Sequence, residues 1–371
     1  MLVGIDASRA IAGQRTGTEN YSLGLIRALL ARGRFDYRLY CRAAPPPELA
    51  DLAGARAEMR VMPAPRLWTH TRFASDLRRY PPDALLVPAH VLPLTHPPAS
   101  VVTVHDVGFR YFPAAHPRRQ RLYLEASTFW AARRAARLLA DSDATRRDMV
   151  RLYGVPPSRI LVAYPAVDPQ YTPEAAPDEA AVLRQRYDLA QRYLLFVGTL
   201  QPRKNIGVLV EALAQAPPDI SLVLVGRPGW GGEAERLRAQ VERLGLSERV
   251  RFLGHAPAAD LPGLMRQALA LALPSLHEGF GMPLAEAMAC GTPTLAANTS
   301  SLPEVVGDAG RLLPPHAADA WAAALTRVAE DVAVRDEMRA RGLAQARRFT
   351  WERAAVVAEA ALIAAYAQFG R

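Results

Sequence analysis

The chain has 371 residues, with 50% hydrophobic and 22% charged side chains, which excludes intrinsic disorder as a description of the whole chain and predicts about two domains. The formal net charge is +9, and residues 1–170 carry the whole excess, with 24 basic and 14 acidic side chains against 21 and 22 in residues 171–371. We therefore expect the first half to attract an anionic surface or substrate, unless a coding bias for arginine has only decorated a solvated face. No nucleic-acid partner is predicted.

Apolar runs alternate with helical patterns along the first half of the chain. We predict short strands at residues 3–5, 100–104, 138–140 and 160–163. A helix follows the first strand, because Leu23, Ile26, Leu29 and Leu30 recur on one helical face. The Pro-rich and polar segment 166–180 is then typical of an interdomain linker.

The alternation restarts after this linker. Strands are predicted at residues 193–198, 221–226, 249–254, 268–275 and 292–297, with helices between them. A terminal helix is predicted with Thr350 as N-cap and with an apolar face of Trp351, Ala355, Ala358, Leu362, Tyr366 and Phe369. This order predicts an α/β fold of two Rossmann-like, doubly wound domains that face each other across a cleft, with ligands at the carboxyl ends of the strands.

The sequence also bears on the cellular compartment. No apolar run reaches the ~18 residues of a membrane span, and Asp6 and Arg9 lie where a signal peptide needs an apolar stretch. Cys41 and Cys290 are too few and too far apart for a disulfide framework or a cysteine metal site. We therefore expect a protein of the reducing cytoplasm.

The densest motif is LPSLHEGFGMPLAEAMACGTPTLA, at residues 273–296. A predicted strand ends there in a loop with Gly279 and Gly281, and a helix follows. Such glycines let backbone N–H groups approach a phosphate, whose charge the helix N-terminus favours. Glu278 in the loop and Glu286 one turn into the helix are spaced to accept hydrogen bonds from paired sugar hydroxyls.

Lys204 is the single lysine among 45 basic residues. It lies in the segment FVGTLQPRKN, residues 196–205, directly after a predicted strand. A lone lysine among so many arginines indicates a site that requires a compact ammonium and not a planar guanidinium. Chance retention of one lysine codon is the alternative.

Together these motifs resemble the retaining, nucleotide-sugar-dependent glycosyltransferases of family 4, which have the GT-B fold. Glu278 and Glu286 match the E-x7-E pattern of that family. Five further segments match it in the order in which they occur in the family. They are the glycine loop at residues 7–21, the cleft histidine at 103–109, the end of the first domain at 164–169, the diphosphate loop at 196–205 and the closing helix at 348–355. The resemblance implies an acceptor-binding domain of residues 1–172, joined by a returning helix at 350–371. Residues 173–349 would form the domain that binds the nucleotide-sugar.

The resemblance also implies which residues meet the donor diphosphate. Lys204 and the loop glycine Gly198 match the family's diphosphate contacts. The family's arginine most often follows that glycine, where this chain has Thr199, and Arg203 is the expected substitute. Gly17 should let the N-terminus of the first helix face the diphosphate.

Other matching residues concern the sugar and the nucleotide. The resemblance places Glu278 on the transferred sugar, Glu286 on the ribose, and His105 beside the reacting sugar, although by position alone His105 is also typical of a histidine at a strand end. His255 lies where the family binds the base, and a surface role is equally plausible for it. Backbone contacts to the donor sugar or phosphate are expected at Phe280, Gly281 and Met282. His105, Lys204, Arg203 and Glu278 are thus the candidate catalytic residues.

Two further motifs favour structural roles. Asp141-Ser142-Asp143 has the D-x-D spacing of a metal site, but it precedes a helical pattern and is more typical of a helix cap, so no metal is expected. Ser301 and Glu304 have the spacing of a capping box.

A basic, aromatic-bearing helix is expected at residues 118–137, which contain six arginines and the aromatic residues Tyr123, Phe129 and Trp130. Such a helix suits the anionic inner face of a membrane, as a peripheral contact. The alternative, which we favour, is a helix whose aromatic side chains face the core and whose arginines face water.

The resemblance implies an enzyme that moves a hexose from a nucleoside diphosphate sugar to a lipid-linked or polysaccharide acceptor, without a cofactor. The variant TLQPRKN resembles mannosyltransferases of surface-polysaccharide assembly, which favours GDP-mannose as the donor and leaves UDP-sugars open. The alternatives are a nucleotide-sugar epimerase or glycosyl phosphorylase on the same fold, and a non-catalytic sugar-binding protein.

Overall fold

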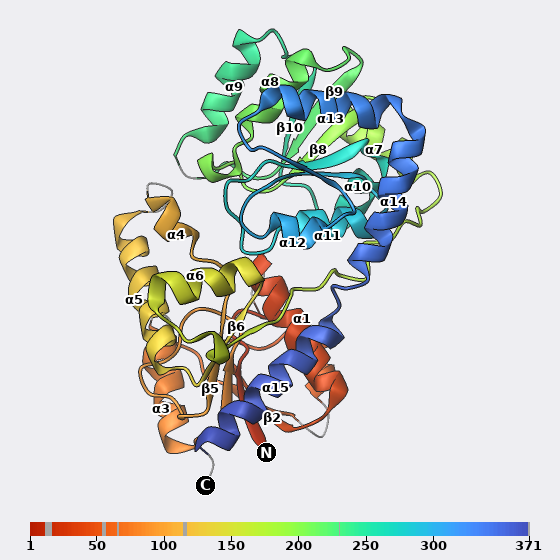
Figure 1. The fold of residues 1–371 in the computed structure, drawn as a ribbon. Coiled ribbons are helices and arrows are strands. Elements are labelled where there is room, and N and C mark those ends of the chain that lie inside the picture. Colours follow the sequence, from red (N-terminus) through yellow and green to blue (C-terminus); the bar gives the residue numbers. More distant parts are fainter. Residues whose placement is uncertain (12–16, 54–56, 65–66, 114–116, 230, 370–371) are drawn as a thin grey trace. The chain divides into compact units, whose positions relative to one another are not determined.

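The structure is a computed structural model of the chain, and it describes residues 1–11, 17–53, 57–64, 67–113, 117–229 and 231–369 (Figure 1). The chain forms two compact units. The first unit comprises Met1–Arg110, Arg118–Ala166 and Thr350–Arg371, and the second comprises Tyr111–Pro117 and Val167–Phe349. Each unit is an α/β unit around a parallel sheet, so the predicted fold class is confirmed.

The first unit is built on a seven-stranded sheet in the order β3-β2-β1-β4-β5-β6-β7. Its strands are β1 (Leu2–Asp6), β2 (Asp36–Cys41), β3 (Ala57–Val61), β4 (Ala84–Val87), β5 (Ser100–Val104), β6 (Arg137–Ala140) and β7 (Ile160–Val162). The strand order reverses between β1 and β4, because the chain first builds outward on one side of β1 and then on the other. The four predicted strands correspond to β1, β5, β6 and β7, whereas β2, β3 and β4 were not predicted.

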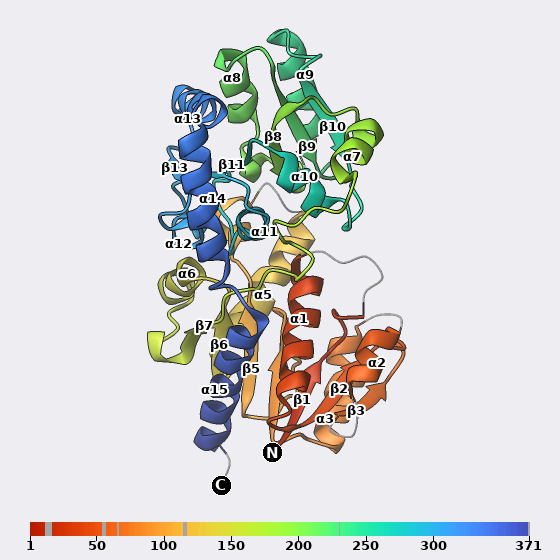
Figure 2. The ribbon, with the colours of Figure 1, turned by 90° about the vertical axis from the view of Figure 1, so that its right-hand side faces the viewer.

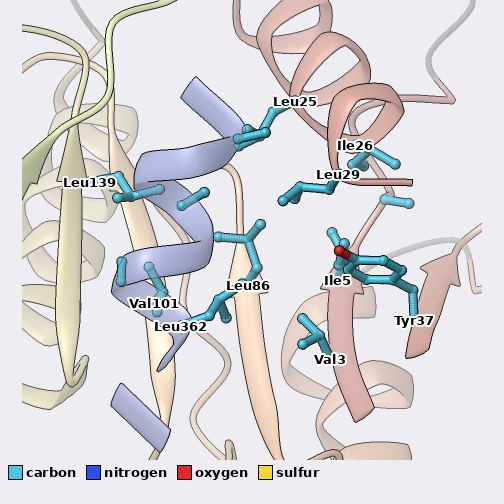
Figure 3. Packing of buried hydrophobic residues seen from close by; sticks show 14 of the residues in the cluster. Val3, Ile5, Leu25, Ile26, Leu29, Tyr37, Leu86, Val101, Leu139 and Leu362 are labelled. Atoms are coloured by element: carbon cyan, nitrogen blue, oxygen red, sulfur yellow. The ribbon is translucent and has the colours of Figure 1, made fainter. Parts of the chain in front are cut away.

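Helices cover both faces of this sheet. They are α1 (Gly17–Arg32), α2 (Pro47–Ala53), η2 (Trp68–His70), α3 (Arg72–Arg79), α4 (Gly108–Tyr111), α5 (Arg118–Arg134), α6 (Asp143–Tyr153), η4 (Pro157–Arg159) and α15 (Trp351–Phe369). Successive residues of a strand point to opposite faces. Leu139 therefore packs in one core with Leu25 of α1 and Leu362 of α15 (Figure 3), whereas Leu138 packs in the other core with Met149 of α6.

The C-terminal helix α15 packs on the first unit beside α1 (Figures 1 and 2). Thr350 caps it as predicted, because its Oγ1 accepts a hydrogen bond of 3.3 Å from the backbone N–H of Arg353. The fully buried part of the predicted apolar face consists of Ala355, Ala358 and Leu362. Tyr366 and Phe369 are 39% and 47% exposed, so this face ends earlier than the periodicity predicts.

The second unit is built on a six-stranded sheet in the order β10-β9-β8-β11-β12-β13. Its strands are β8 (Arg192–Val197), β9 (Ile220–Val225), β10 (Val250–Gly254), β11 (Ala270–Leu273), β12 (Thr294–Ala297) and β13 (Arg311–Leu313). Here the order reverses between β8 and β11. Every residue of β9, β11 and β12 is buried, as expected of parallel strands covered on both faces.

The helices of the second unit are α7 (Glu179–Tyr187), η5 (Pro202–Lys204), α8 (Gly207–Gln215), α9 (Glu233–Arg243), α10 (Leu261–Gln267), α11 (Met282–Ala289), α12 (Leu302–Val306), α13 (Ala318–Glu330) and α14 (Val332–Ala346). Helix α8 packs against α13, and α11 packs against α14. The predicted helices after β8, β9 and β11 are therefore present. The connections that matter for chemistry are those that leave β8 and β11.

Candidate active site

The carboxyl ends of β8 and β11 form the point at which the strand order of the second sheet reverses. Arg203 and Lys204 lie in the 3-10 turn η5, which is the first helical element after β8, and Glu278 lies in the loop between β11 and α11. Loops diverge at such a point, which makes it the usual ligand site of a doubly wound sheet. The fold therefore gathers two cations and a carboxylate at the place where a ligand is expected.

The carboxylate of Glu278 binds both cations. Lys204 Nζ and Ser275 Oγ donate to its Oε1, the serine at 2.6 Å. Arg203 Nη1 donates to Oε2 at 3.1 Å and to the carbonyl of His277 at 2.7 Å. Burial alone would raise the pKa of Glu278, but the charges of Lys204 and Arg203 outweigh it and lower that pKa to about 2. Glu278 is therefore ionised at every physiological pH.

Backbone and side-chain amide hydrogen bonds hold the turn that carries Arg203 and Lys204 against the loop after β11. The N–H of Leu276 donates to the carbonyl of Arg203 at 2.8 Å. Asn205 ends the turn at φ 54°, a left-handed conformation that asparagine tolerates better than most residues. Its Nδ2 donates to the carbonyls of Pro274 at 3.3 Å and Pro315 at 2.6 Å. The positions of the cations are thus built into the scaffold.

Gly198 lies where two loops approach closely. A Cβ on Gly226, in the loop after β9, would lie 1.8 Å from the carbonyl oxygen of Gly198, so Gly226 has no room for a side chain. The N–H of Gly198 donates to Val225 at 2.8 Å, and the N–H of Gly226 donates to Gly254 at 2.7 Å. A Cβ on Gly198 would lie 3.8 Å from Cε of Lys204, so this glycine lies beside the lysine side chain.

Two serines fix the loop that carries Glu278. Ser300 Oγ donates to the carbonyl of Glu278 at 2.6 Å and accepts from its N–H at 3.1 Å. Ser301 Oγ donates to the carbonyls of Glu278 at 3.0 Å and Phe280 at 2.9 Å. Ser301 is the N-cap residue of α12 but makes no side-chain capping hydrogen bond, so the predicted capping box with Glu304 is wrong for this serine. Its hydroxyl stabilises the loop instead.

The loop leads into the N-terminus of α11. Phe280 is buried and packs edge-on against Phe349, with ring centroids 5.1 Å apart. Gly281 is the N-cap at φ 103°, and a Cβ there would lie 2.8 Å from Leu302. Met282 then begins the helix. The first N–H groups of a helix lack helical partners and favour an anion, which suits the predicted phosphate or sugar contacts of this segment.

Glu286 lies one turn into α11 and is partly buried. Burial raises the pKa of Glu286, and the nearby charge of Asp168 raises it further, whereas a hydrogen bond with the buried Tyr171 lowers it. The net result is a pKa of about 7. Tyr171 and Asp168 belong to the segment expected to be a linker, and their interaction with Glu286 was not predicted. The charge of Glu286 therefore changes close to neutral pH.

The roles expected of His255 at the base and of Gly17 at the diphosphate remain predictions. His255 follows β10 and is exposed, and Gly17 is the first residue of α1 in the first unit. A Cβ on Gly17 would meet no atom within 4 Å, so close packing does not require a glycine there.

In the first unit, His105 follows β5 and Asp141 follows the adjacent strand β6. His105 Nδ1 lies 2.7 Å from Asp141 Oδ2, and both side chains are buried. The ring of His105 also contacts the rings of Tyr21 at 4.9 Å and His90 at 5.4 Å. Burial lowers the pKa of His105, but the charge and hydrogen bond of Asp141, with the charge of Asp106, outweigh it and raise that pKa. The family motif contains the histidine, whereas its pairing with Asp141 was not predicted.

Each residue of the D-x-D motif has a partner within the first unit. Ser142 is the N-cap of α6, and its side chain accepts a 3.0 Å hydrogen bond from the N–H of Thr145, which confirms the predicted cap. Asp141 binds His105, and Asp143 pairs with two arginines of its own helix. In the part of the chain that the structure describes, no group of three or more His, Cys, Asp or Glu side chains is arranged to hold a metal ion.

Helix α5 exposes a row of apolar side chains. Leu122, Tyr123 and Phe129 are 64%, 49% and 51% exposed, and the exposed Arg119 and Arg133 lie at the two ends of this row. The favoured expectation that the aromatic residues face the core is therefore wrong for Tyr123 and Phe129. None of the described helices has the length and apolar character needed to cross a bilayer.

Comparison with known proteins gives consistent results. Residues 15–171 match the model of Glycosyltransferase Family 4, and residues 183–345 match the model of Glycosyl transferases group 1. The O-antigen chain mannosyltransferase B of Escherichia coli is 36% identical over 369 residues, which cover 94% of this chain and 96% of the relative.

Solved structures agree with the described fold. Anabaena HepE in complex with UDP-glucose has a TM-score of 0.73 at 23% identity, over 97% of this chain and 98% of HepE. WaaG, a glycosyltransferase involved in lipopolysaccharide biosynthesis, has a TM-score of 0.70 at 21% identity, over 98% of this chain and 99% of WaaG.

Proposed function

Because the chain belongs to the group 1 and family 4 glycosyltransferases, which have the GT-B fold, we propose that it moves a hexose from a nucleoside diphosphate sugar to a glycan or lipid-linked acceptor. We further propose that configuration is retained and that no metal ion takes part. The observation that carries the donor assignment is the cluster of Arg203, Lys204 and Glu278 at the strand-order reversal of the second unit.

The chemistry needs stabilisation of a leaving diphosphate. Cleavage of the sugar–phosphate bond places negative charge on the leaving oxygens, and preorganised cations aimed at them lower the barrier more than they stabilise the ground state. Lys204 and Arg203 suit that role, because the scaffold fixes the turn that carries them. We assign the ribose to Glu286 and, on the family resemblance, place His105 at the reacting sugar.

We propose retention through attack on the same face that the diphosphate leaves. In this mechanism the leaving phosphate oxygen accepts the proton of the acceptor hydroxyl, and the new glycosidic bond forms as the sugar–phosphate bond breaks. In this mechanism Lys204 and Arg203 stabilise the negative charge of the leaving group, and no covalent glycosyl-enzyme forms.

GDP-mannose is the favoured donor. The name of the Escherichia coli relative, a mannosyltransferase, supports mannose, as does the variant loop TLQPRKN at residues 199–205. A thermal-shift screen against GDP, UDP and ADP tests the base, because a ligand at 100 times its Kd adds about 2.7 kcal/mol of stability. A larger shift with UDP than with GDP would replace GDP-mannose by a UDP-sugar.

Residues of α5 support a peripheral contact with an anionic membrane surface. The exposed Leu122, Tyr123 and Phe129 offer an apolar row, and Arg119 and Arg133 supply positive charge at its ends. Wild-type protein should sediment with acidic vesicles at low salt, and salt should weaken this binding. The double variant Tyr123→Ser, Phe129→Ser should bind less, and absence of wild-type binding at low salt would exclude the contact.

Lys204→Ala tests the proposed function of the donor site. We expect kcat to fall by about 10²–10³, the usual cost of one preorganised donor to a developing oxyanion. Lys204→Arg keeps the positive charge but replaces the compact ammonium by a planar guanidinium. A similar loss of kcat in this variant, with unchanged folding, would show that the loss comes from catalysis and not from stability. Full activity of a folded Lys204→Ala protein would contradict the assignment. Product analysis with labelled donor also separates transfer from epimerisation or phosphorolysis, because only transfer places the label on the acceptor.

A further inference from the structure

The two cations proposed to receive the donor diphosphate already have a counter-anion inside the protein. Lys204 and Arg203 each donate to one oxygen of the Glu278 carboxylate. Lys204 and Glu278 are only 8% and 7% exposed, so water screens this charge cluster weakly. A diphosphate bound to the same cations would lie close to a carboxylate that carries full negative charge.

Glu278 cannot easily withdraw from this position. Ser275 Oγ donates to its Oε1 at 2.6 Å. Ser300 binds both its backbone N–H and its carbonyl, and Ser301 also donates to that carbonyl. The carboxylate is thus anchored through its side chain and its backbone, and it stays near the cations when another anion arrives.

We propose that Glu278 is an internal counter-anion that competes with the donor diphosphate for Lys204 and Arg203. This inference rests on the proposed function of the same site. Glu278 keeps the two cations ordered and neutralised before the diphosphate binds, and its repulsion promotes release of the nucleoside diphosphate product. Glu278 then acts as a positioning residue for the cations, in addition to its expected contact with the sugar.

The competition has a measurable size. At an effective dielectric of about 20, a like charge about 6 Å away weakens the binding of a singly charged anion by roughly a hundredfold, and relaxation reduces this. Removing the charge of Glu278 should therefore tighten diphosphate binding by at least about tenfold. A residue that only contacts the sugar, or only supports the fold, would leave diphosphate binding unchanged or weaker.

Calorimetry on the full chain tests this with three probes: GDP, UDP and inorganic pyrophosphate. Glu278→Gln should bind pyrophosphate and the preferred nucleoside diphosphate about tenfold more tightly than wild type, while its sugar-transfer rate falls. Glu242→Gln, at an exposed site on α9, removes the same charge far from the cluster and should change neither affinity. Equal or weaker binding by Glu278→Gln overturns the inference.

Two further measurements guard against a variant that fails to fold. Glu278→Asp keeps the charge but shortens the side chain, so its carboxylate should hold the cations less closely and diphosphate binding should tighten to a smaller degree. Lys204 is the single lysine of the chain, so ¹⁵N-lysine labelling gives one side-chain ammonium signal in the wild type. Pyrophosphate should shift that signal as Lys204 changes its anion, and an unmoved signal at saturation overturns the inference.

The outcomes separate this inference from the proposed function. If pyrophosphate binds more tightly to Glu278→Gln but the wild type binds neither nucleotide and transfers no sugar, the counter-anion role stands and the glycosyl donor assignment falls. If the wild type binds a nucleoside diphosphate and transfers sugar but Glu278→Gln binds no more tightly, the function stands and the counter-anion role falls.

Discussion

Asp141 Oδ2 lies 2.7 Å from Nδ1 of His105, at the carboxyl ends of the adjacent strands β6 and β5. Both side chains are buried, and whenever the carboxylate of Asp141 is ionised it can only accept a hydrogen bond, so that Nδ1 of His105 is then the donor. The contact fixes the orientation of the imidazole. The pair therefore extends the candidate machinery of the first unit beyond the histidine that the family motif contains.

Asp141→Asn should lower the pKa of His105, because the charge and hydrogen bond of Asp141 raise it in the folded protein. We expect the transfer rate to fall, because the imidazole that we place at the reacting sugar loses the partner that orients it. NMR titration of ¹⁵N-labelled histidine measures the pKa, and the pH profile of kcat/KM measures its effect on catalysis. Asp143→Asn, two residues away, is the matched control and should change neither. An unaltered pKa in Asp141→Asn would show that the pair does not form in solution.

Much of the fold could be predicted from the sequence because central parallel strands are buried on both faces. β9 and β11 are buried throughout and stand out as apolar runs, although the four-residue β4, which is also buried throughout, was not predicted. β3 was missed because it is an edge strand in which every residue is at least partly exposed, with Glu58 and Arg60 forming an ion pair on it. Such a strand has no apolar run to detect.

The candidate site was only partly predictable, for a physical reason. Arg203, Lys204 and Glu278 lie in local motifs that directly follow strands, so the sequence contains their pattern. Asp141 reaches His105 through the pairing of β5 with β6, and Tyr171 reaches Glu286 from a segment that looks like a linker. Contacts of that kind depend on tertiary packing, and one sequence has no pattern that indicates them.

Donor binding should depend on pH near neutrality through Glu286, whose pKa is about 7. The carboxylate accepts hydrogen bonds from ribose hydroxyls more strongly than the protonated acid, so affinity for the nucleoside diphosphate should rise as pH rises from 6 to 8. Calorimetry at several pH values measures this. The phosphate groups of the ligand titrate in the same way with either protein, but Glu286→Gln has no carboxyl group at this position. The difference between the pH profiles of affinity of the wild type and Glu286→Gln therefore gives the contribution of Glu286.

Tyr171→Phe should move that midpoint upward, because the hydrogen bond with Tyr171 lowers the pKa of Glu286 in the wild type. At pH 7 the variant should therefore bind the nucleotide more weakly than the wild type, with the two converging at pH values above both midpoints. The same calorimetric series provides the measurement. A pH profile identical to that of the wild type would remove Tyr171 from the ribose site.

Gly24→Ala should destabilise the first unit, because a Cβ at Gly24 of α1 would lie 2.2 Å from the indole of Trp351 in α15. Overpacking of this kind costs about 1–3 kcal/mol. Urea unfolding measures the loss, and Gly17→Ala, in the same helix with no atom within 4 Å of the added Cβ, should unfold within about 0.5 kcal/mol of wild type. In a double-mutant cycle, Trp351→Leu should relieve part of the cost of Gly24→Ala. Purely additive effects would mean that the two helices do not pack as described.

Glu359→Gln should loosen the attachment of α15 to the first unit. Glu359 is fully buried, and its two oxygens accept from Arg32 of α1 at 2.9 and 3.1 Å, with Arg34 3.5 Å away. The neutral amide of Glu359→Gln cannot accept two charge-assisted hydrogen bonds from Arg32, so the free energy of unfolding should fall by more than it does on loss of an exposed partner. Glu352 lies 3.4 Å from the same Arg32 but is 78% exposed, so Glu352→Gln should cost less than about 1 kcal/mol. Equal urea midpoints for the two variants would show that burial does not set the strength of this attachment.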